Sequence, residues 1–403
     1  MGDYEEEQLH DIDSGTSRSG SPIGTRRPQL THSTAAHRPR AQAPPRLAVH
    51  AAMALRTALL RAADRLQPAP LALLEHAHHF VLAHLLASFA ELGIADHLDD
   101  GPKDAEELAS LTDCKAEALH RALRAAAVFG VVRLDRHGRF HATRLTKPLR
   151  SKDPGAAGDW CRVIGSSAHQ NAWTGLTSSL RTGRSAFRTV HGMSFFQWFD
   201  KHPEERHRFA AGIGGLTLME APLLVAAYPF PDDGVICDVG GGTGVLLAEI
   251  LRQRPRLRGV LVETPSVLEE AATYLGSVGV ADRVELVEGD LFGTVSATAD
   301  IYLLKWVLHD WDDRTCEAIV KVVAATMPTG AKLIVIEGVQ EQNTVHPRFS
   351  MIDLQMLVAT EGGRERSVEQ LEQLVARAGL RVGTSRRTAT DLVLTEATKP
   401  APT

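Results

Sequence analysis

The stretch that decides the fold of this chain is Asp238-Val239-Gly240-Gly241-Gly242-Thr243-Gly244. It follows the apolar segment 235–237 and leads into 245–251, whose apolar residues have helical spacing, so the order is strand, glycine turn, helix. Glycine lets the backbone turn tightly and lets a ligand approach to van der Waals distance. In an open α/β sheet, nucleotide-like ligands bind at this kind of turn.

The turn lacks the spacing of the dinucleotide fingerprint, because Val245 stands where the third glycine would be. A glycine turn preceded by an acid, Asp238, suits a ligand that has no pyrophosphate but has a cationic, amine-bearing part. S-adenosylmethionine is such a ligand. Taken alone, the turn could equally be a tight connection with no ligand.

The ends of the next two predicted strands carry acids as well. Segment 259–262 ends in Glu263, which can accept hydrogen bonds from ribose hydroxyls or can be an ordinary exposed carboxylate. Segment 284–288 leads into Gly289-Asp290-Leu291-Phe292, which offers a carboxylate and an apolar surface for an adenine ring. Acid or glycine at three successive strand ends favours a binding site over chance.

A fourth predicted strand, 301–305, leads into a polar and aromatic loop. The strings DVGGGTG (238–244), GDLF (289–292), LLKWVLHDWDD (303–313) and EGGRERS (361–367) together resemble the small-molecule O-methyltransferases that use S-adenosylmethionine. These enzymes occur in plant phenylpropanoid and bacterial aromatic polyketide pathways, and the resemblance covers about 70 to 395. It implies an α/β fold: a Rossmann-like, mostly parallel seven-stranded sheet behind an N-terminal, helical, winged-helix dimerisation domain.

The resemblance assigns the catalytic base to His309, with Asp310 beside it. A phenol, with a pKa of about 10, is mostly protonated at neutral pH, and a histidine base can add on the order of 10² to 10⁴ in rate. A structural histidine at the strand end is the alternative. Two carboxylates stand where the family has a partner for this histidine: Glu337 and Glu365. Glu337 is favoured by its position directly after the apolar segment 333–336, since a buried carboxylate needs a partner.

The resemblance also implies a set of cofactor-binding residues. Glu263 departs from the aspartate that is commoner in the family, which keeps the acceptor oxygens but moves them by one methylene. The expected cofactor-binding residues are Asp238, Gly240, Gly242, Gly244, Glu263, Gly289, Asp290, Leu291 and Lys305.

Composition limits the class of protein. The 403 residues are 44% hydrophobic and carry a net charge of -5, which allows two packed domains and does not favour a polyanionic partner. No continuous apolar run reaches the roughly 18 residues that span a bilayer, so we expect no membrane segment. The four cysteines form no C-x-x-C pair, which fits reduced thiols in a cytoplasmic enzyme. We expect no metal site.

The chain divides into four predicted parts. Residues 1–48 have too few apolar side chains to fold and are expected to be disordered. We expect no secretory signal there, and our hypothesis is that the native protein starts at Met53. The other parts are a winged-helix-like dimerisation domain (65–150), a helical connector with the acceptor pocket (151–230) and the S-adenosylmethionine-binding domain (231–398).

The N-terminal part has two open interpretations. Segment 71–98 has helical spacing, and the histidines within it lack a carboxylate or cysteine at ligand spacing, which argues against metal. Two predicted helices, 104–111 and 115–129, precede a hairpin over 131–142, a winged-helix pattern that could bind DNA as a regulator does. The second helix is alanine-rich and has few groups to read base edges. The resemblance instead implies a homodimer with no nucleic acid.

The middle of the chain, 160–228, is helical and aromatic. The resemblance places it over the acceptor, a small aromatic molecule, although most of its aromatic residues are expected to be core. These residues are Trp173, Phe187, Phe195, Phe196, Trp198 and Phe199. A few proteins resembling this family use the cofactor for hydroxylation or decarboxylation instead, and the sequence contains no residue that excludes this.

Overall fold

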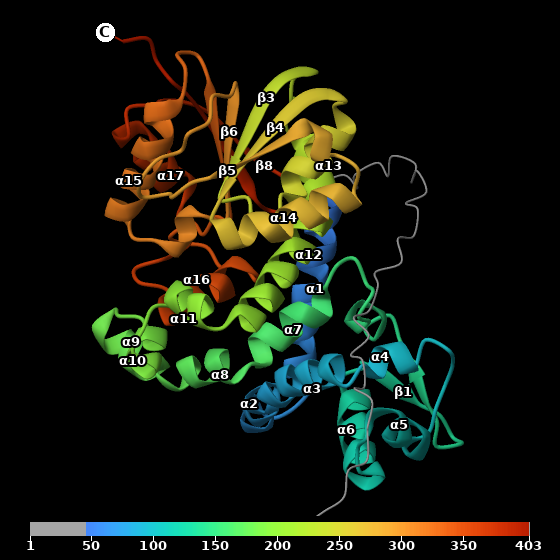
Figure 1. Cartoon of the computed structure of the whole chain (residues 1–403). Helices are drawn as coiled ribbons and strands as arrows, with labels where there is room; N and C mark the ends of the chain where they lie inside the picture. Colours follow the sequence, from blue (N-terminus) through green and yellow to red (C-terminus); the bar gives the residue numbers. More distant parts are fainter. Residues whose placement is uncertain (1–45, 403) are drawn as a thin grey trace, which may run out of the picture. The chain divides into compact units, whose positions relative to one another are not determined.

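The computed structural model describes residues 46–402. Its centre is a seven-stranded sheet in the order β5-β4-β3-β6-β7-β9-β8 (Figure 1). The five strands from β5 to β7 are parallel, whereas β9 runs antiparallel to both of its neighbours. The strands are β3 (Asp233–Val239), β4 (Arg256–Glu263), β5 (Val284–Glu288), β6 (Ile301–Lys305), β7 (Lys332–Glu337), β8 (Arg381–Arg387) and β9 (Val393–Thr398).

Helices cover both faces of this sheet. On one face lie α13 (Val245–Gln253) and α14 (Pro265–Ser277), and on the other α15 (Asp313–Thr326) and α17 (Val368–Arg377) (Figure 1). Because both faces are covered, the central strands are mostly apolar and buried; β6, for example, is buried along its whole length, including Lys305 at its end. Alternate residues enter the two cores, so Ile236 packs with α13 whereas Cys237 packs with α15.

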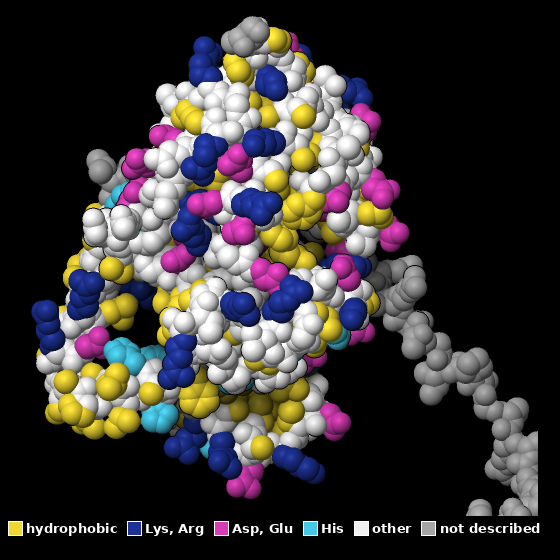
Figure 2. Space-filling view, turned by 90° about the vertical axis from the view of Figure 1, so that its left-hand side faces the viewer, with side chains coloured by type: hydrophobic (Ala, Val, Ile, Leu, Met, Phe, Trp, Pro, Cys, Tyr) yellow, Lys and Arg dark blue, Asp and Glu magenta, His cyan; other side chains and the backbone are white. Residues whose placement is uncertain are grey.

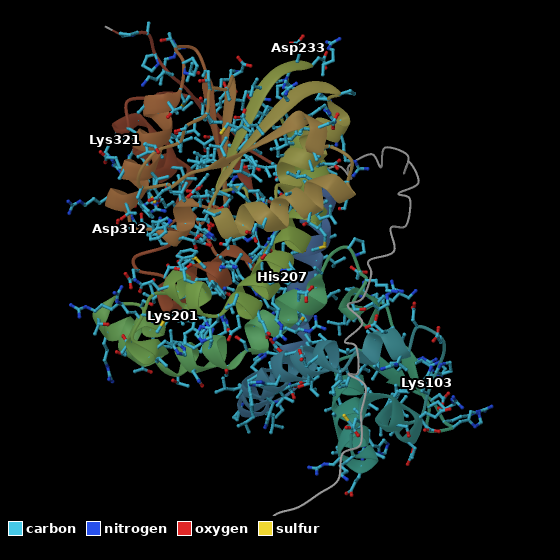
Figure 3. All side chains as sticks on the ribbon, in the orientation of Figure 1. Lys103, Lys201, His207, Asp233, Asp312 and Lys321 are labelled. Carbon is cyan, nitrogen blue, oxygen red and sulfur yellow. The ribbon has the colours of Figure 1, made fainter. Side chains whose placement is uncertain are left out.

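The parallel strands all end at the same edge of the sheet. Asp233 at the start of β3 and Asp312 beyond the end of β6 mark the two opposite edges in Figure 3. Three short 3-10 turns, at Lys147–Leu149, Ala281–Arg283 and Leu308–Asp310, complete the connections. The last of them (η3) carries His309 directly beyond β6. The carboxyl edge of the sheet is therefore where the predicted site residues gather.

The N-terminal part is helical with one small hairpin, as the winged-helix pattern predicts. Gly138 has a φ of +79° and turns the hairpin. The helical segment predicted over 71–98 is interrupted at His79 and at Gly93, where successive helices meet. The elements are α1 (Arg46–Asp64), α2 (Ala69–His78), α3 (Phe80–Glu91), α4 (Ile94–His97), α5 (Ala105–Thr112), α6 (Ala116–Val128), β1 (Val132–Leu134) and β2 (Phe140–Ala142).

The predicted disordered segment 1–48 lies outside the described residues, except for 46–48, which begin α1.

A run of helices connects this part to the sheet, and one further helix, α16 (Phe349–Ala359), follows β7. The connecting helices are α7 (Ala157–Gly165), α8 (Ser167–Thr174), α9 (Leu176–Thr182), α10 (Ala186–His191), α11 (Phe195–Lys201) and α12 (Pro203–Ala227).

Helix α12 is long and apolar enough to span a membrane, although the sequence has no continuous apolar run of that length. Among the described residues, it is one helix for which length and composition allow a membrane span. Its average hydropathy is high, although the charged Glu220 interrupts the apolar run. Glu220 is buried and bonded to Lys305 of β6, and Leu224 and Val225 lie in the core under the sheet. These contacts are those of a core helix.

Candidate active site

The glycine turn lies against a buried carboxylate. Asp238 at the end of β3 is 1% exposed, and neither of its carboxylate oxygens has a hydrogen-bond partner within residues 46–402. A Cβ added at Gly241 would lie 2.4 Å from Cγ of Asp238, so only glycine fits there. Gly241 was absent from the predicted set, because sequence spacing does not reveal which glycine faces the acid. Burial raises the pKa of Asp238 to about 7, with Lys305 acting in the opposite direction.

Glu263 joins the second strand end to the turn. Its Oε1 accepts a hydrogen bond from the amide of Gly242 at 2.8 Å, and its Oε2 accepts one from the amide of Thr264 at 3.0 Å. The φ of Gly242 is +59°, a left-handed conformation that aims this amide at the carboxylate. Burial raises the pKa of Glu263, and the two amide bonds oppose that shift.

The third strand end completes the same edge. The amide of Gly289 donates to the carbonyl of Glu263, and a Cβ at Gly289 would lie 2.3 Å from Val262. Leu291 reaches the turn, within 3.9 Å of a Cβ built at Gly240. Asp290 is exposed, and its Oδ1 accepts from the amide of Phe292 at 2.9 Å. Of the predicted cofactor-binding residues, Glu263 and Leu291 therefore reach the turn beside Asp238, and Gly244 begins α13, whereas no hydrogen bond joins Asp290 to the turn within residues 46–402.

Lys305 is bonded to the core helix. Its Nζ lies 3.2 Å from Oε2 of Glu220 and 3.0 Å from Oγ1 of Thr217, and its side chain is 6% exposed. Burial lowers the pKa of Lys305, while Glu220 and, at longer range, Asp238 oppose that shift. Sequence analysis missed Glu220, since it lies 85 positions away on α12.

His309 is paired with Glu365. Its Nδ1 lies 2.8 Å from Oε1 of Glu365, whose side chain is fully buried, and its Nε2 lies 3.6 Å from Oδ1 of Asp310. Burial disfavours the charged imidazole, but the charge of Asp310, the bond to Glu365 and the charge of Glu337 together raise the pKa of His309 to about 9. The pair combines a titratable group with a fixed partner, the arrangement of an oriented base.

The preference for Glu337 as the partner of this imidazole is corrected by the structure. Oε1 of Glu337 accepts from the amides of Val307 and Leu308, at 3.1 and 2.8 Å, and its Oε2 has no partner within residues 46–402. The argument that a buried carboxylate needs a partner was sound, but backbone amides meet that need. Burial raises the pKa of Glu337 to about 7, against the charge of His309.

Arg366, which sequence analysis passed over, holds the loop that carries His309. Its side chain is 1% exposed and donates to the carbonyls of Leu308 and Trp311, both at 2.7 Å, and to Asp313 at 2.9 Å. The amide of Arg364 donates to the carbonyl of His309 at 2.8 Å. The EGGRERS string therefore supplies both the carboxylate partner of His309 and the support of its backbone.

Two cavities lie among the connecting helices. The larger, about 550 Å³, is walled by apolar side chains of α7, α8, α12 and α16, with the paired Glu220 and Arg348 among its polar groups. Its other lining residues are Trp160, Ile164, Trp173, Leu216, Met219, Met351, Ile352, Gln355 and Thr390. A volume of this size suits a small aromatic molecule.

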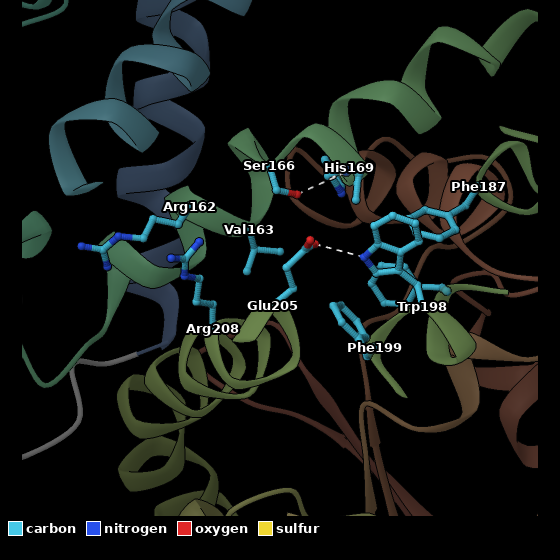
Figure 4. A pocket seen from close by; sticks show the side chains of 11 residues that line it. Arg162, Val163, Ser166, His169, Phe187, Trp198, Phe199, Glu205 and Arg208 are labelled. Atoms are coloured by element: carbon cyan, nitrogen blue, oxygen red, sulfur yellow. Dashed lines mark hydrogen bonds between the residues drawn. The ribbon is translucent and has the colours of Figure 1, made fainter. Parts of the chain in front are cut away.

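The smaller cavity, about 20 Å³, has room for about one water molecule (Figure 4). Phe187, Phe195, Trp198 and Phe199 line it, and Trp198 donates to Glu205 at 3.1 Å. Three of these aromatic residues, Phe187, Phe195 and Phe199, belong to a buried core cluster. Phe196 instead stacks on Trp311, with 5.4 Å between ring centroids. Of the six aromatic residues in the region assigned to acceptor binding, Trp173 lines the larger cavity.

Comparison with known proteins agrees with this geometry. Residues 173–381 match the O-methyltransferase domain family, and residues 74–151 match the O-methyltransferase dimerisation domain. The chain belongs to the O-methyltransferase family. It is 37% identical to a mitomycin biosynthesis 6-O-methyltransferase of Streptomyces lavendulae, over 72% of this chain and 83% of that one. The chain is also 37% identical to the phenazine O-methyltransferase PhzM of Lysobacter antibioticus, over 76% of this chain and 90% of that one.

Two solved methyltransferase structures are also similar. The crystal structure of LaPhzM superposes with a TM-score of 0.79 at 35% identity, covering 83% of this chain and all of that one. A methyltransferase of calicheamicin biosynthesis, solved in its S-adenosylhomocysteine-bound form, gives a TM-score of 0.71 at 34% identity, covering 84% of this chain and 99% of that one. This O-methyltransferase is dependent on S-adenosylmethionine.

The residues present fit that cofactor. Asp238 has a buried carboxylate with no partner among residues 46–402, beside a turn that any Cβ at Gly241 would obstruct. Glu263 presents a carboxylate to the same turn, and Leu291 an apolar surface. An amine-bearing, hydroxylated and aromatic ligand finds acceptors and an apolar contact there.

Proposed function

We propose that this O-methyltransferase methylates a hydroxyl of a small aromatic metabolite and that His309 is its general base. The single observation that carries the proposal is the 2.8 Å contact between Nδ1 of His309 and Oε1 of Glu365. A carboxylate at Nδ1 holds the proton on that nitrogen, which leaves Nε2 to accept the proton of the acceptor hydroxyl.

The carboxylates around His309 bring its pKa close to that of a phenol. A phenol has a pKa of about 10, close to the value of about 9 to which the pKa of His309 is raised. Matched values make the transfer nearly even, so the phenolate can form without a large energetic penalty. Asp310 and Glu365 then stabilise the imidazolium that results.

When bound, S-adenosylmethionine supplies an already activated methyl group. The remaining work belongs to the chain, which must hold the acceptor in line and remove its proton. Alignment alone can supply about 7 kcal/mol or more of the barrier. We assign cofactor binding to Asp238, the glycine turn, Glu263, Gly289, Asp290 and Leu291, with Lys305 bracing the same edge through Glu220.

The cavity of about 550 Å³ is our candidate for the acceptor site. Trp160 and Trp173 give it flat aromatic walls, and Met219 and Met351 give it adaptable ones. The indole of Trp306 connects it to the base: its ring centroid lies 4.7 Å from that of His309, and its Nε1 lies 3.4 Å from Glu220 in the cavity wall. The names of the mitomycin and phenazine relatives support a polycyclic aromatic acceptor.

The dimerisation domain supports assembly as a homodimer. Apolar side chains of α1, α2 and the start of α3 are exposed, among them Leu59, Leu73 and Phe80 at 62%, 70% and 63%. In Figure 2, hydrophobic side chains gather at the lower left with histidines beside them, at the height of α2 in Figure 1. We assign dimerisation to residues 65–150, acceptor binding to 151–230 and cofactor binding to 231–398.

We also propose that the enzyme works in the cytoplasm, since its four cysteines are unpaired.

The test uses the full-length protein, methyl-labelled S-adenosylmethionine and a panel of hydroxylated polycyclic aromatic compounds. We expect a product that gains one labelled methyl group, and a His309→Ala variant that retains cofactor affinity but loses about 10² to 10⁴ in turnover. His207→Ala removes an exposed imidazole on α12 and is the matched control. Unchanged turnover in His309→Ala would exclude the base role, and a product that gains oxygen or loses carbon dioxide would exclude methyl transfer as the reaction.

A further inference from the structure

Arg348 is a cation in the wall of an otherwise largely apolar cavity. It stands directly before α16, and its guanidinium lies 5.8 Å from the ring centroid of Trp306 and 5.6 Å from that of Phe349. Its side chain is 36% exposed and lines the cavity of about 550 Å³. The positive end of the α16 dipole adds to the potential at this point.

The charge of Arg348 is only partly neutralised. Its one carboxylate partner among residues 46–402 is Glu220, whose Oε1 accepts from Nη2 at 2.7 Å. The other oxygen of Glu220 lies 3.2 Å from Nζ of Lys305, so two cations share a single carboxylate. Arg348 uses one of its five N–H donors in that pair, so the other N–H donors of its planar guanidinium are available to a second hydrogen-bond acceptor.

From this arrangement we infer that the acceptor carries a carboxylate, which Arg348 binds inside the cavity. The inference rests on the proposed function and narrows its substrate class to hydroxylated aromatic acids. Guanidinium matches carboxylate geometry with two parallel hydrogen bonds, and such charge-assisted bonds are stronger in a site walled by aromatic rings than in water.

The position of Arg348 fits a single ring system that reaches both groups. The Trp306 ring centroid lies 4.7 Å from the His309 ring and 5.8 Å from the Arg348 guanidinium, so one indole adjoins both the base and the cation. A fused-ring acceptor can therefore place its hydroxyl toward His309 while its carboxylate meets Arg348. Arg348 is thus a specificity-determining residue, and His309 remains the group that takes the proton.

Matched pairs of probes test this inference. Hydroxy-1-naphthoic acids and the corresponding hydroxy-1-naphthamides have the same rings and differ in charge. We measure their affinity by calorimetry on the S-adenosylhomocysteine complex and their kcat/KM by mass spectrometry. The wild type is expected to favour the acids by about tenfold to a hundredfold, the range for a charged hydrogen-bond pair.

The variants separate recognition from support of the fold. Arg348→Gln is expected to abolish the preference by weakening the acids while leaving the amides and the affinity for S-adenosylhomocysteine unchanged. Arg348→Lys keeps the positive charge but lacks the parallel N–H donors of the guanidinium, so it should retain part of the preference for acids over amides. This variant also provides a test if Arg348→Gln fails to fold. Arg188→Gln, which removes an arginine paired with Glu361 outside the cavity lining, is the control and should behave as the wild type.

Three outcomes would overturn the inference. Equal loss for acids and amides in Arg348→Gln would make Arg348 structural. If the wild type methylates the acids and the amides equally, recognition of a carboxylate on the acceptor is excluded, whereas the proposed methyl transfer is unaffected. Failure to methylate either series or the wider panel of hydroxylated aromatic compounds, with S-adenosylhomocysteine still bound, would overturn the proposed function and this inference together.

Discussion

The buried carboxylate of Glu365 lies 2.8 Å from Nδ1 of His309, although 56 positions separate the two residues in the chain. The contact ties the loop after β6 to the segment between α16 and α17. The amide of Glu365 donates in turn to Oδ1 of Asp353 at 2.8 Å, so the carboxylate is itself held by α16. The orientation of the His309 imidazole thus depends on two connections at the carboxyl edge of the sheet.

Replacing Glu365 by glutamine tests this relationship. Glu365→Gln keeps the shape of the side chain but removes its charge, so we expect turnover to fall on the order of 10² or more with cofactor affinity unchanged. The loss of one carboxylate also lowers the pKa of His309, and the rising limb of the pH–rate profile should move to lower pH. Steady-state kinetics across pH measures both effects.

Glu361→Gln is the matched control, because Glu361 is exposed and pairs with Arg188. Equal turnover in the Glu365 and Glu361 variants would show that the imidazole needs no charged partner.

The pH dependence of the wild type follows from the raised pKa of His309. The neutral imidazole is the base, so kcat/KM should rise with pH and level off above about 9. The same shift bears on stability: the folded-state value lies above the usual 6.5, so the stabilisation is complete below 6.5 and is lost as pH rises through about 9. Thermal unfolding of wild type and His309→Asn from pH 6 to 10 measures this loss.

A limb at pH 9 that persists in His309→Ala would belong to the acceptor hydroxyl and would contradict the assignment.

Much of the fold could be predicted from sequence because its signals are local. The predicted strands at 284–288 and 301–305 are β5 and β6, and the glycine turn stands where the strand–turn–helix order put it. The site was harder, because its partners are distant in sequence. A buried carboxylate at the end of β7 looked like the partner of His309, but nothing local shows that Glu337 bonds to backbone amides while Glu365 reaches the imidazole.

The acceptor cavity could not be predicted for a related reason. Helical spacing shows that α7, α8 and α12 are amphipathic or buried, but not which face meets which neighbour. Trp173 and Trp198, both aromatic residues of the same segment, consequently line different cavities.

Two arginines that share Asp313 differ in what their loss should cost. Arg366 is 1% exposed and holds the carbonyls on either side of the base, whereas Arg364 is 46% exposed. Arg366→Met should therefore destabilise the fold by about 2–6 kcal/mol, because it leaves the carbonyls of Leu308 and Trp311 without this donor at about 1–3 kcal/mol each, and should lower turnover. Arg364→Met should cost about 0–1 kcal/mol, as for a surface pair. Urea unfolding compares them, and equal losses would refute the distinction.

Glu337 should make the enzyme less stable at alkaline pH than a neutral side chain would. Burial raises its pKa to about 7 from 4.5, so the cost of its charge appears as pH rises from 4.5 through 7. Glu337→Gln keeps an oxygen that can accept from the amides of Val307 and Leu308. We expect its melting temperature to exceed that of the wild type at pH 8.5 and to approach it at pH 5. A difference that is independent of pH would contradict the raised pKa.

Substitutions at two glycines with equally open surroundings distinguish the effect of backbone conformation from the effect of steric crowding. A Cβ at Gly242 or at Gly276 would meet nothing within 4 Å, but only Gly242 has a left-handed φ, at +59°. Gly242→Ala should therefore cost about 1–2 kcal/mol in backbone strain and turn the amide away from Glu263, which weakens S-adenosylmethionine binding; Gly242→Val should abolish it. Gly276→Ala lies in α14 and should bind the cofactor as the wild type does. Calorimetric titration measures each affinity, and wild-type binding by Gly242→Val would place the cofactor away from this turn.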